Sequence, residues 1–220
     1  MNYLVVGQQR TGSSLLHHYV VNKNDNFGFN EIFLKVQPPN ADDKWYYNLL
    51  IEEKFELLEY LKKKEIYVPW KCFPSEIIVD EFGYNTKYEQ RLRNLLAGYK
   101  ILTVDRDPWD VFLSYSYQDS IEWKTSHRFN DKNFIELDSF EIDLNKIPFI
   151  CMRWKISQRF INSLDIYHTF RYNDLSINSM KEYFQTDWNG LTKPNQIDYE
   201  SIATNLKEAK ELFDYEMYGT

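Results

Sequence analysis

The sequence contains little cysteine, glycine and proline, and it has no long apolar run. Its two cysteines, Cys72 and Cys151, are too few for a disulfide framework or a four-ligand zinc site, and we expect both to be buried thiols without a chemical role. Seven glycines and seven prolines in 220 residues argue against a turn-rich all-β protein. Because no run reaches about 18 apolar residues, no transmembrane segment is predicted. No signal-peptide pattern is present either, so the expected location is cytoplasmic.

Positive charge is also in short supply. The chain carries 26 Lys and Arg against 33 Asp and Glu, which gives a formal net charge of −7. Proteins bind nucleic-acid backbones through basic faces, so this composition argues against a nucleic-acid partner. Hydrophobic residues make up 43% and aromatic residues 17% of the chain, enough to fill a core. No repeat or linker-like stretch divides the sequence, and we expect one domain over residues 1–220.

Short apolar runs alternate with helical patterns along the chain. Runs rich in Val, Ile and Tyr predict strands at 3–6, 66–70, 100–105 and 165–170. The clearest helical pattern covers residues 41–64, and further helices are predicted to begin at Ser13, near Ser75, at Pro108, near Ile147, at Asp174 and at Tyr199. Strands that alternate with helices make βαβ units, so we expect a three-layer α/β fold with a mainly parallel central sheet flanked by helices. Ligands of such sheets bind beyond the carboxyl ends of the strands.

A phosphate-binding pattern follows the first predicted strand. Gly7 and Gly12 have the Gly-x4-Gly spacing of loops that bind an anion with backbone N–H groups and a helix N-terminus. Nucleoside triphosphatases carry Lys after the second glycine, whereas this chain has Ser13 there and a cation, Arg10, inside the loop. A guanidinium suits bidentate binding of an oxyanion. The loop therefore favours a phosphate or sulfate ligand over a magnesium–triphosphate, and the alternative is a plain turn with a serine helix cap.

A second set of polar residues follows the predicted strand at 100–105. Arg106 stands at the end of this strand, Pro108 marks the start of a helix, and Ser114 lies two turns into that helix. The guanidinium and the hydroxyl can therefore face one ligand at the edge of the sheet. The alternative is an ion pair of Arg106 at the strand end.

Together these two segments resemble the sulfotransferases that use 3′-phosphoadenosine 5′-phosphosulfate (PAPS). The run from Gln9 to Leu15 is similar to the family's 5′-phosphosulfate loop, and the run from Arg106 to Ser114 has the spacing of its 3′-phosphate motif, Arg-x-Pro-x-Asp-x3-Ser. The resemblance implies a fold like that of P-loop nucleoside triphosphatases and a metal-free PAPS site that releases adenosine 3′,5′-bisphosphate. The residues that it assigns to PAPS are Gln9, Arg10, Thr11, Gly12, Ser13, Ser14, Arg106 and Ser114.

Weaker similarity continues along the chain. Residues 68–74 resemble the strand that reads Lys-Thr-His-x-Pro in cytosolic sulfotransferases, and Trp154 with residues 171–175 resembles the family's late Trp and Tyr-Glu-Asp-Leu segment. Two positions depart from the pattern: Gln9 replaces a proline of the loop, and Phe73 replaces the histidine that serves as base in the cytosolic members. The chain is thus more similar to the bacterial, carbohydrate-modifying and tyrosine-modifying sulfotransferases, which use a glutamate.

That similarity makes Glu31 the candidate general base, in an aromatic-rich segment after the first helix. Most glutamates are solvated or ion-paired, which is the alternative for Glu31. His17 is the reserve base, although His17 and His18 are more typical of helix-surface or packing residues. Arg10 is expected to bind the phosphosulfate, and Lys71 to reach its bridging or sulfonate oxygens unless Lys71 is a surface lysine.

The resemblance implies an acceptor hydroxyl or amine on a small molecule, a carbohydrate or a peptide. Four residues after the second motif are expected to line an acceptor cleft or to form a loop, namely Trp123, Lys124, His127 and Arg128. Two other functions stay open. A nucleotide kinase of the same fold is disfavoured by the missing Lys after Gly12, and a non-catalytic module would bind the nucleotide without reacting it.

Overall fold

A four-stranded parallel sheet lies at the centre of the protein. The computed structural model describes residues 2–23, 28–29, 31–33, 45–80, 83–121, 137–188 and 197–219. The sheet has the strand order β2-β1-β5-β6 and parallel pairing throughout, and it consists of β1 (Tyr3–Val6), β2 (Lys71–Cys72), β5 (Lys100–Asp105) and β6 (Ile166–Arg171). The carboxyl ends of the strands therefore meet at one edge.

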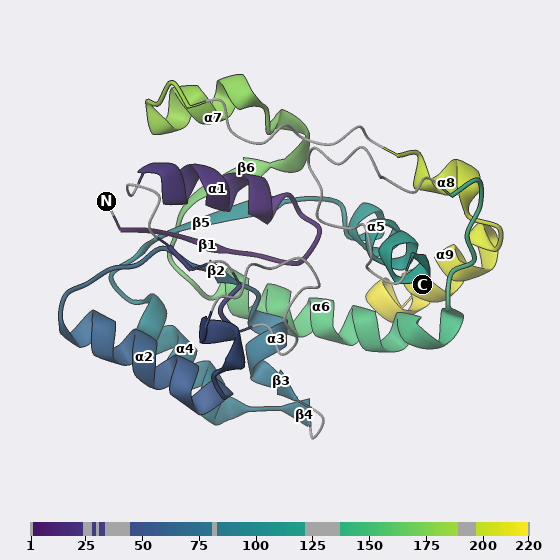
Figure 1. Cartoon of the computed structure of the whole chain (residues 1–220). Coiled ribbons are helices and arrows are strands. Elements are labelled where there is room, and N and C mark those ends of the chain that lie inside the picture. Colours follow the sequence, from purple (N-terminus) through teal and green to yellow (C-terminus); the bar gives the residue numbers. More distant parts are fainter. Residues whose placement is uncertain are drawn as a thin grey trace.

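Helices cover both faces of the sheet (Figure 1). One face carries α1 (Ser13–Lys23) and α7 (Ile177–Phe184). The other carries α2 (Ile51–Lys63), α3 (Pro74–Ile78), α4 (Thr86–Leu96) and α6 (Ile147–Asn162). Beyond the carboxyl ends of the strands lie α5 (Pro108–Ser120), α8 (Tyr199–Ile202) and α9 (Leu206–Tyr218), which pack with the first turns of α6 in a separate apolar cluster. The expected α/β fold with a parallel sheet between helical layers is confirmed.

The alternation of side chains along β1 explains the two helical layers. Leu4 and Val6 belong to the apolar cluster shared with α2, α3, α4 and α6, whereas Tyr3 and Val5 belong to the cluster shared with α1 and α7. Successive side chains of a strand point to opposite faces, so an unbroken apolar run buries both faces of the strand. β1 and β5 are the two inner strands, and each is followed by one of the predicted anion motifs.

The strand predicted at 66–70 is wrong, because β2 forms immediately after it, at Lys71–Cys72. Pro69 has no N–H to donate to a ladder, and the pairing with β1 begins only at Lys71. The carbonyl of Pro69 instead accepts a hydrogen bond from the N–H of Phe29 at 2.9 Å. This contact brings the segment that carries Glu31 to the amino end of β2, and residues 31–33 form a turn.

Several helix boundaries also differ from the prediction. In the predicted helix 41–64, residues 45–48 form a 3-10 helix, α2 begins at Ile51, and residues 41–44 lie outside the described part. α7 begins at Ile177 rather than at Asp174, because the side chain of Ser176 caps it. The helix expected from Tyr199 is divided into α8 and α9, since the intervening backbone pairs with Phe140. Three elements were not predicted, namely α4, β3 (Val79–Asp80) and β4 (Gly83–Tyr84).

Candidate functional site

The loop between β1 and α1 is wound tightly at the carboxyl edge of the sheet. The N–H of Gly7 donates to the carbonyl of Cys72 at 3.0 Å, and Thr11 Oγ1 donates to the carbonyl of Gln8 at 2.9 Å. Arg10 and Gly12 have positive φ angles of 66° and 87°. α1 begins at the next residue, and the N–H groups of Leu15 and Leu16 donate to the carbonyl of Gly12 at 3.0 and 3.3 Å, so the N–H groups of Ser13 and Ser14 come before the helix's own hydrogen bonds. This is the backbone arrangement of an anion-binding loop.

Gly12 is required by both its conformation and its surroundings. Its φ lies in the left-handed region, which side chains disfavour. A Cβ at this position would also stand 2.9 Å from ring carbon Cδ2 of Tyr172 and 2.9 Å from Cδ1 of Leu175. The loop therefore packs directly against the 3-10 helix η3 (Tyr172–Asp174) that follows β6. Gly12, rather than a serine, occupies the position before the helix, so the alternative of a serine cap does not apply.

The two predicted arginines meet at this edge. Arg106 Nη1 donates to the carbonyl oxygen of Arg10 at 2.7 Å, and Arg10 Nε donates to Ser114 Oγ at 3.3 Å. The guanidinium of Arg106 also lies over the ring of Tyr172, 4.0 Å from its centroid. Ser114 Oγ in turn donates to the hydroxyl of Tyr199 at 3.4 Å. The first loop, the end of β5, α5 and α8 are thus joined in one polar cluster.

Neither arginine of this cluster forms an ion pair with a carboxylate of the described residues. The Nε of Arg106 is buried, and no described group accepts a hydrogen bond from it. The alternative of an ion pair at the strand end therefore does not hold within that part of the chain. Burial is the main cause that lowers the pKa of Arg10; Tyr199 opposes this shift, and the charge of Arg106 adds to it. Two neighbouring guanidiniums with spare donors favour binding of an anion.

Lys71 and Glu31 form a buried ion pair beside the same loop. The side chains of Lys71 and Glu31 are 1% and 8% exposed, and Lys71 Nζ also donates to Ser14 Oγ at 2.6 Å. The ring of Phe73 lies 5.1 Å from this ammonium. Lys71 is therefore not a surface lysine, whereas for Glu31 the alternative of an ion-paired glutamate holds. Burying two charges costs free energy, which the attraction within the pair offsets only in part, so a buried ion pair is weak evidence for a role in stability.

The remaining predicted residues lie around this centre in different ways. Ser13 is buried at the start of α1. His17 is buried one turn further along, whereas His18 is exposed. The side-chain amide Nε2 of Gln9 donates to Glu76 Oε1 of α3 at 3.0 Å. The four candidate acceptor residues, Trp123, Lys124, His127 and Arg128, lie outside the described residues.

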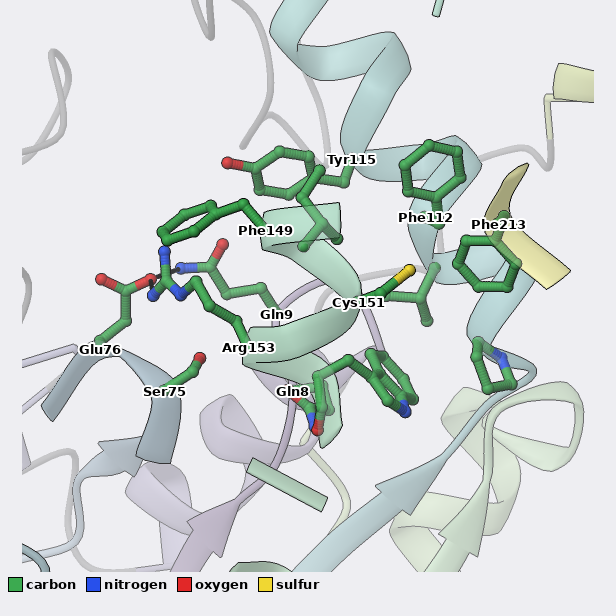
Figure 2. A pocket seen from close by; sticks show the side chains of 14 residues that line it. Gln8, Gln9, Ser75, Glu76, Phe112, Tyr115, Phe149, Cys151, Arg153 and Phe213 are labelled. Atoms are coloured by element: carbon green, nitrogen blue, oxygen red, sulfur yellow. Dashed lines mark hydrogen bonds and ion pairs between the residues drawn. The ribbon is translucent and has the colours of Figure 1, made fainter. Parts of the chain in front are cut away.

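A pocket opens on the side of the loop where Gln9 points (Figure 2). Its polar side holds Gln9, Glu76 and Arg153, and its apolar side includes the rings of Phe112 and Phe213. The space available to a ligand is about 60 Å3, room for a few water molecules but not for a ring-sized molecule. The pocket thus borders the candidate site without providing a cleft for a large acceptor.

Three residues of this region were missed by the sequence analysis. Tyr199 touches Ser114, and Glu76 and Arg153 pair with each other beside Gln9. None of them belongs to a local motif, because each reaches the loop through long-range packing of α8, α3 or α6. Tyr199 and Glu76 lie at or near the start of a predicted helix, which is too common a position to single them out, and Arg153 lies further along its predicted helix.

Comparisons with protein-family models and with curated proteins give no match. Within the described ranges, no helix is long and apolar enough to cross a membrane. Among the same residues, no group of three or more His, Cys, Asp or Glu side chains is placed to hold a metal ion.

Proposed function

We propose that the protein is a PAPS-dependent sulfotransferase with a P-loop-like fold. The observation that carries the proposal is the convergence of Arg10, Arg106 and Ser114 at the carboxyl ends of β1 and β5. Two segments that resemble separate parts of a PAPS site are about a hundred residues apart in sequence, yet their side chains meet. This convergence supports one ligand that bears two anionic groups.

The residues at this edge fit such a ligand. The loop from Gln9 to Ser14 would bind the 5′-phosphosulfate with its N–H groups and Arg10, and Arg106 with Ser114 would bind the 3′-phosphate. The buried, unsatisfied Nε of Arg106 supplies a donor that no described residue uses. Such an orphan donor costs free energy unless a ligand accepts from it. The overall charge of −7 is no obstacle, because a few cations in a cleft set the local field.

The second cluster supplies groups for the chemistry. When bound, PAPS provides an activated sulfuryl group for transfer to an acceptor oxygen or nitrogen. Glu31 would take the proton that the acceptor loses, and Lys71 would donate hydrogen bonds to oxygens whose negative charge grows during transfer. The hydrogen bond from Lys71 to Ser14 holds Lys71 at the loop, and the ion pair holds Glu31 beside Lys71. Positioning and electrostatics would supply most of the remaining rate, as in phosphoryl transfer.

The donor site is tested by titration calorimetry with adenosine 3′,5′-bisphosphate and 5′-AMP. We expect the bisphosphate to bind at least about tenfold more tightly, because a charge-assisted hydrogen bond contributes about 1.5–3 kcal/mol. Arg106→Gln should remove this preference, and it should also weaken 5′-AMP, because Arg106 holds the carbonyl of Arg10 in the loop. A matched control is Arg91→Gln, which changes an arginine that pairs with Glu52 and Glu59 away from the loop. Equal affinities of the wild-type protein for both nucleotides would refute the proposal.

A non-catalytic nucleotide-binding module is the second candidate. It is favoured by the burial of Glu31, whose side chain is 8% exposed and already paired with Lys71. An acceptor must reach that carboxylate for Glu31 to act as a base. Incubation with PAPS and a panel of alcohols, phenols, sugars and tyrosine peptides separates the two candidates by mass spectrometry. An enzyme adds one SO3 group to an acceptor and loses this activity in Glu31→Gln, whereas a binding module yields no product.

A further inference from the structure

The side chain of Gln9 is hydrogen-bonded to α3, and the same residue of α3 is ion-paired with α6 (Figure 2). The amide Nε2 of Gln9 donates to Glu76 Oε1 of α3 at 3.0 Å, and the same carboxylate oxygen pairs with Arg153 of α6. The Glu76 and Arg153 side chains are 17% and 23% exposed, so the pair is partly shielded from water. A charged acceptor in such a place makes a stronger hydrogen bond to Gln9 than a neutral one.

The next residue, Arg10, needs such a restraint. Its φ of 66° costs about 1–2 kcal/mol in a residue with a side chain, and such a conformation persists only where the surroundings impose it. Position 9 is not a proline, so the covalent chain does not restrict φ immediately before Arg10. On the other side, the carbonyl of Arg10 is held by Arg106 at 2.7 Å. Upstream of the strained residue, the loop is held by Gln9 and also by Gln8, whose amide Nε2 donates to the carbonyl of Trp154 at 3.1 Å.

The hydrogen bond of Gln9 also fixes the loop relative to β2. Glu76 belongs to α3, which begins directly after the short strand β2 that carries Lys71. A loop fastened to α3 therefore keeps Arg10 and Lys71, which come from different strand ends, in a fixed relation. A fixed relation of these residues favours anion binding, because preorganised donors bind more strongly than donors that the ligand must first order.

We propose that Glu76 and Arg153 are positioning residues that hold Gln9, and through it Arg10, in the conformation that binds the anion. The identity of the ligand rests on the proposed function, but the effect on the loop does not. Without the tether the loop samples other conformations, and the ligand must select the competent fraction. The affinity for the anion then falls in proportion to the fraction of molecules whose loop has the binding conformation.

Hydrogen exchange of the ligand-free protein tests the tether by itself. Gln9→Ala removes the hydrogen bond but leaves the Glu76–Arg153 pair, and Glu76→Ala removes both. In each variant we expect the peptide that covers residues 7–14 to exchange about tenfold faster. Glu59→Ala is the matched control, because Glu59 also pairs with an arginine, Arg91, between two helices remote from the loop. Unchanged exchange of the loop peptide in Gln9→Ala overturns the proposal, whether or not Glu76→Ala folds.

Ligand binding provides the second measurement. We expect Gln9→Ala to lower the affinity for adenosine 3′,5′-bisphosphate about tenfold. The double variant Gln9→Glu/Glu76→Gln exchanges the two side chains at equal total charge, and we expect its affinity to lie within about threefold of the wild-type value. Thermal unfolding is measured in parallel, because a purely structural role lowers the melting temperature without this rescue of affinity. Absence of bisphosphate binding to the wild-type protein refutes the proposed donor instead, while the exchange measurement still decides the tether. If the exchanged pair protects the loop again but does not recover affinity, the positioning role is refuted.

Discussion

Replacing Lys71 with methionine measures what the buried Lys71–Glu31 ion pair contributes. These side chains are 1% and 8% exposed, so Lys71→Met leaves the Glu31 carboxylate without its counter-ion in a largely water-free place. Removal of one partner of a buried pair costs about 3–5 kcal/mol. In a chain of this size such a loss lowers the melting temperature by roughly 6–20 °C. The double variant Lys71→Met/Glu31→Gln has no unpaired charge, and we expect it to recover most of the loss.

Urea unfolding followed by fluorescence supplies the four free energies of this cycle. The control is Lys87→Met, because Lys87 and Glu52 form an ion pair whose side chains are 68% and 42% exposed. That exposed pair should contribute less than about 1 kcal/mol. The reasoning is refuted if Lys71→Met loses no more than Lys87→Met, or if the double variant loses the sum of both single changes. The result also sets the temperature at which turnover of Glu31→Gln can be measured on folded protein.

Three further predictions concern the loop, the base and a buried thiol. Glu31→Gln should lower sulfuryl transfer at least about 100-fold in a steady-state assay while bisphosphate affinity stays within about threefold; retained turnover would move the role of base elsewhere. Gly12→Ala should lower stability by about 1–3 kcal/mol and bisphosphate affinity more than tenfold, because the added methyl meets Tyr172 and Leu175. Calorimetry that finds the same stability and affinity in this variant as in the wild-type protein would contradict the prediction. Burial raises the pKa of Cys151 to about 11, so its thiol should react with iodoacetamide at about pH 8 only after urea is added. Labelling is followed by mass spectrometry, and rapid labelling of the native protein would contradict the prediction.

Local patterns in the sequence were sufficient to predict the inner part of the sheet. The strands at 3–6 and 100–105, and the helices that begin at Ser13 and Pro108, are confirmed because unbroken apolar runs and helix-start signals coincide there. The meeting of Arg106 with the first loop also followed from the rule that parallel strands end at one edge. These features depend on short segments, which carry their own signals.

Features that depend on distant partners were not predicted. The strand expected at 66–70 is apolar enough, but the register in which β2 pairs with Val5 and Val6 is decided by tertiary contacts and by Pro69. The pairing of Glu31 with Lys71 joins residues whose local sequences say nothing about each other. The same holds for Glu76, whose contact with Gln9 depends on how α3 and α6 pack.

The candidate site draws on the ends of four strands, and this has a consequence for biosynthesis. Arg10 follows β1, Lys71 is part of β2, Arg106 follows β5, and Tyr172, which lies under Arg106, follows β6. A nascent chain that has not yet released β6 from the ribosome therefore has its two arginines but lacks the ring beneath one of them. Anion affinity should appear late in synthesis and in a single step, so that binding of a nucleotide reports completion of the fold and stabilises only the finished protein.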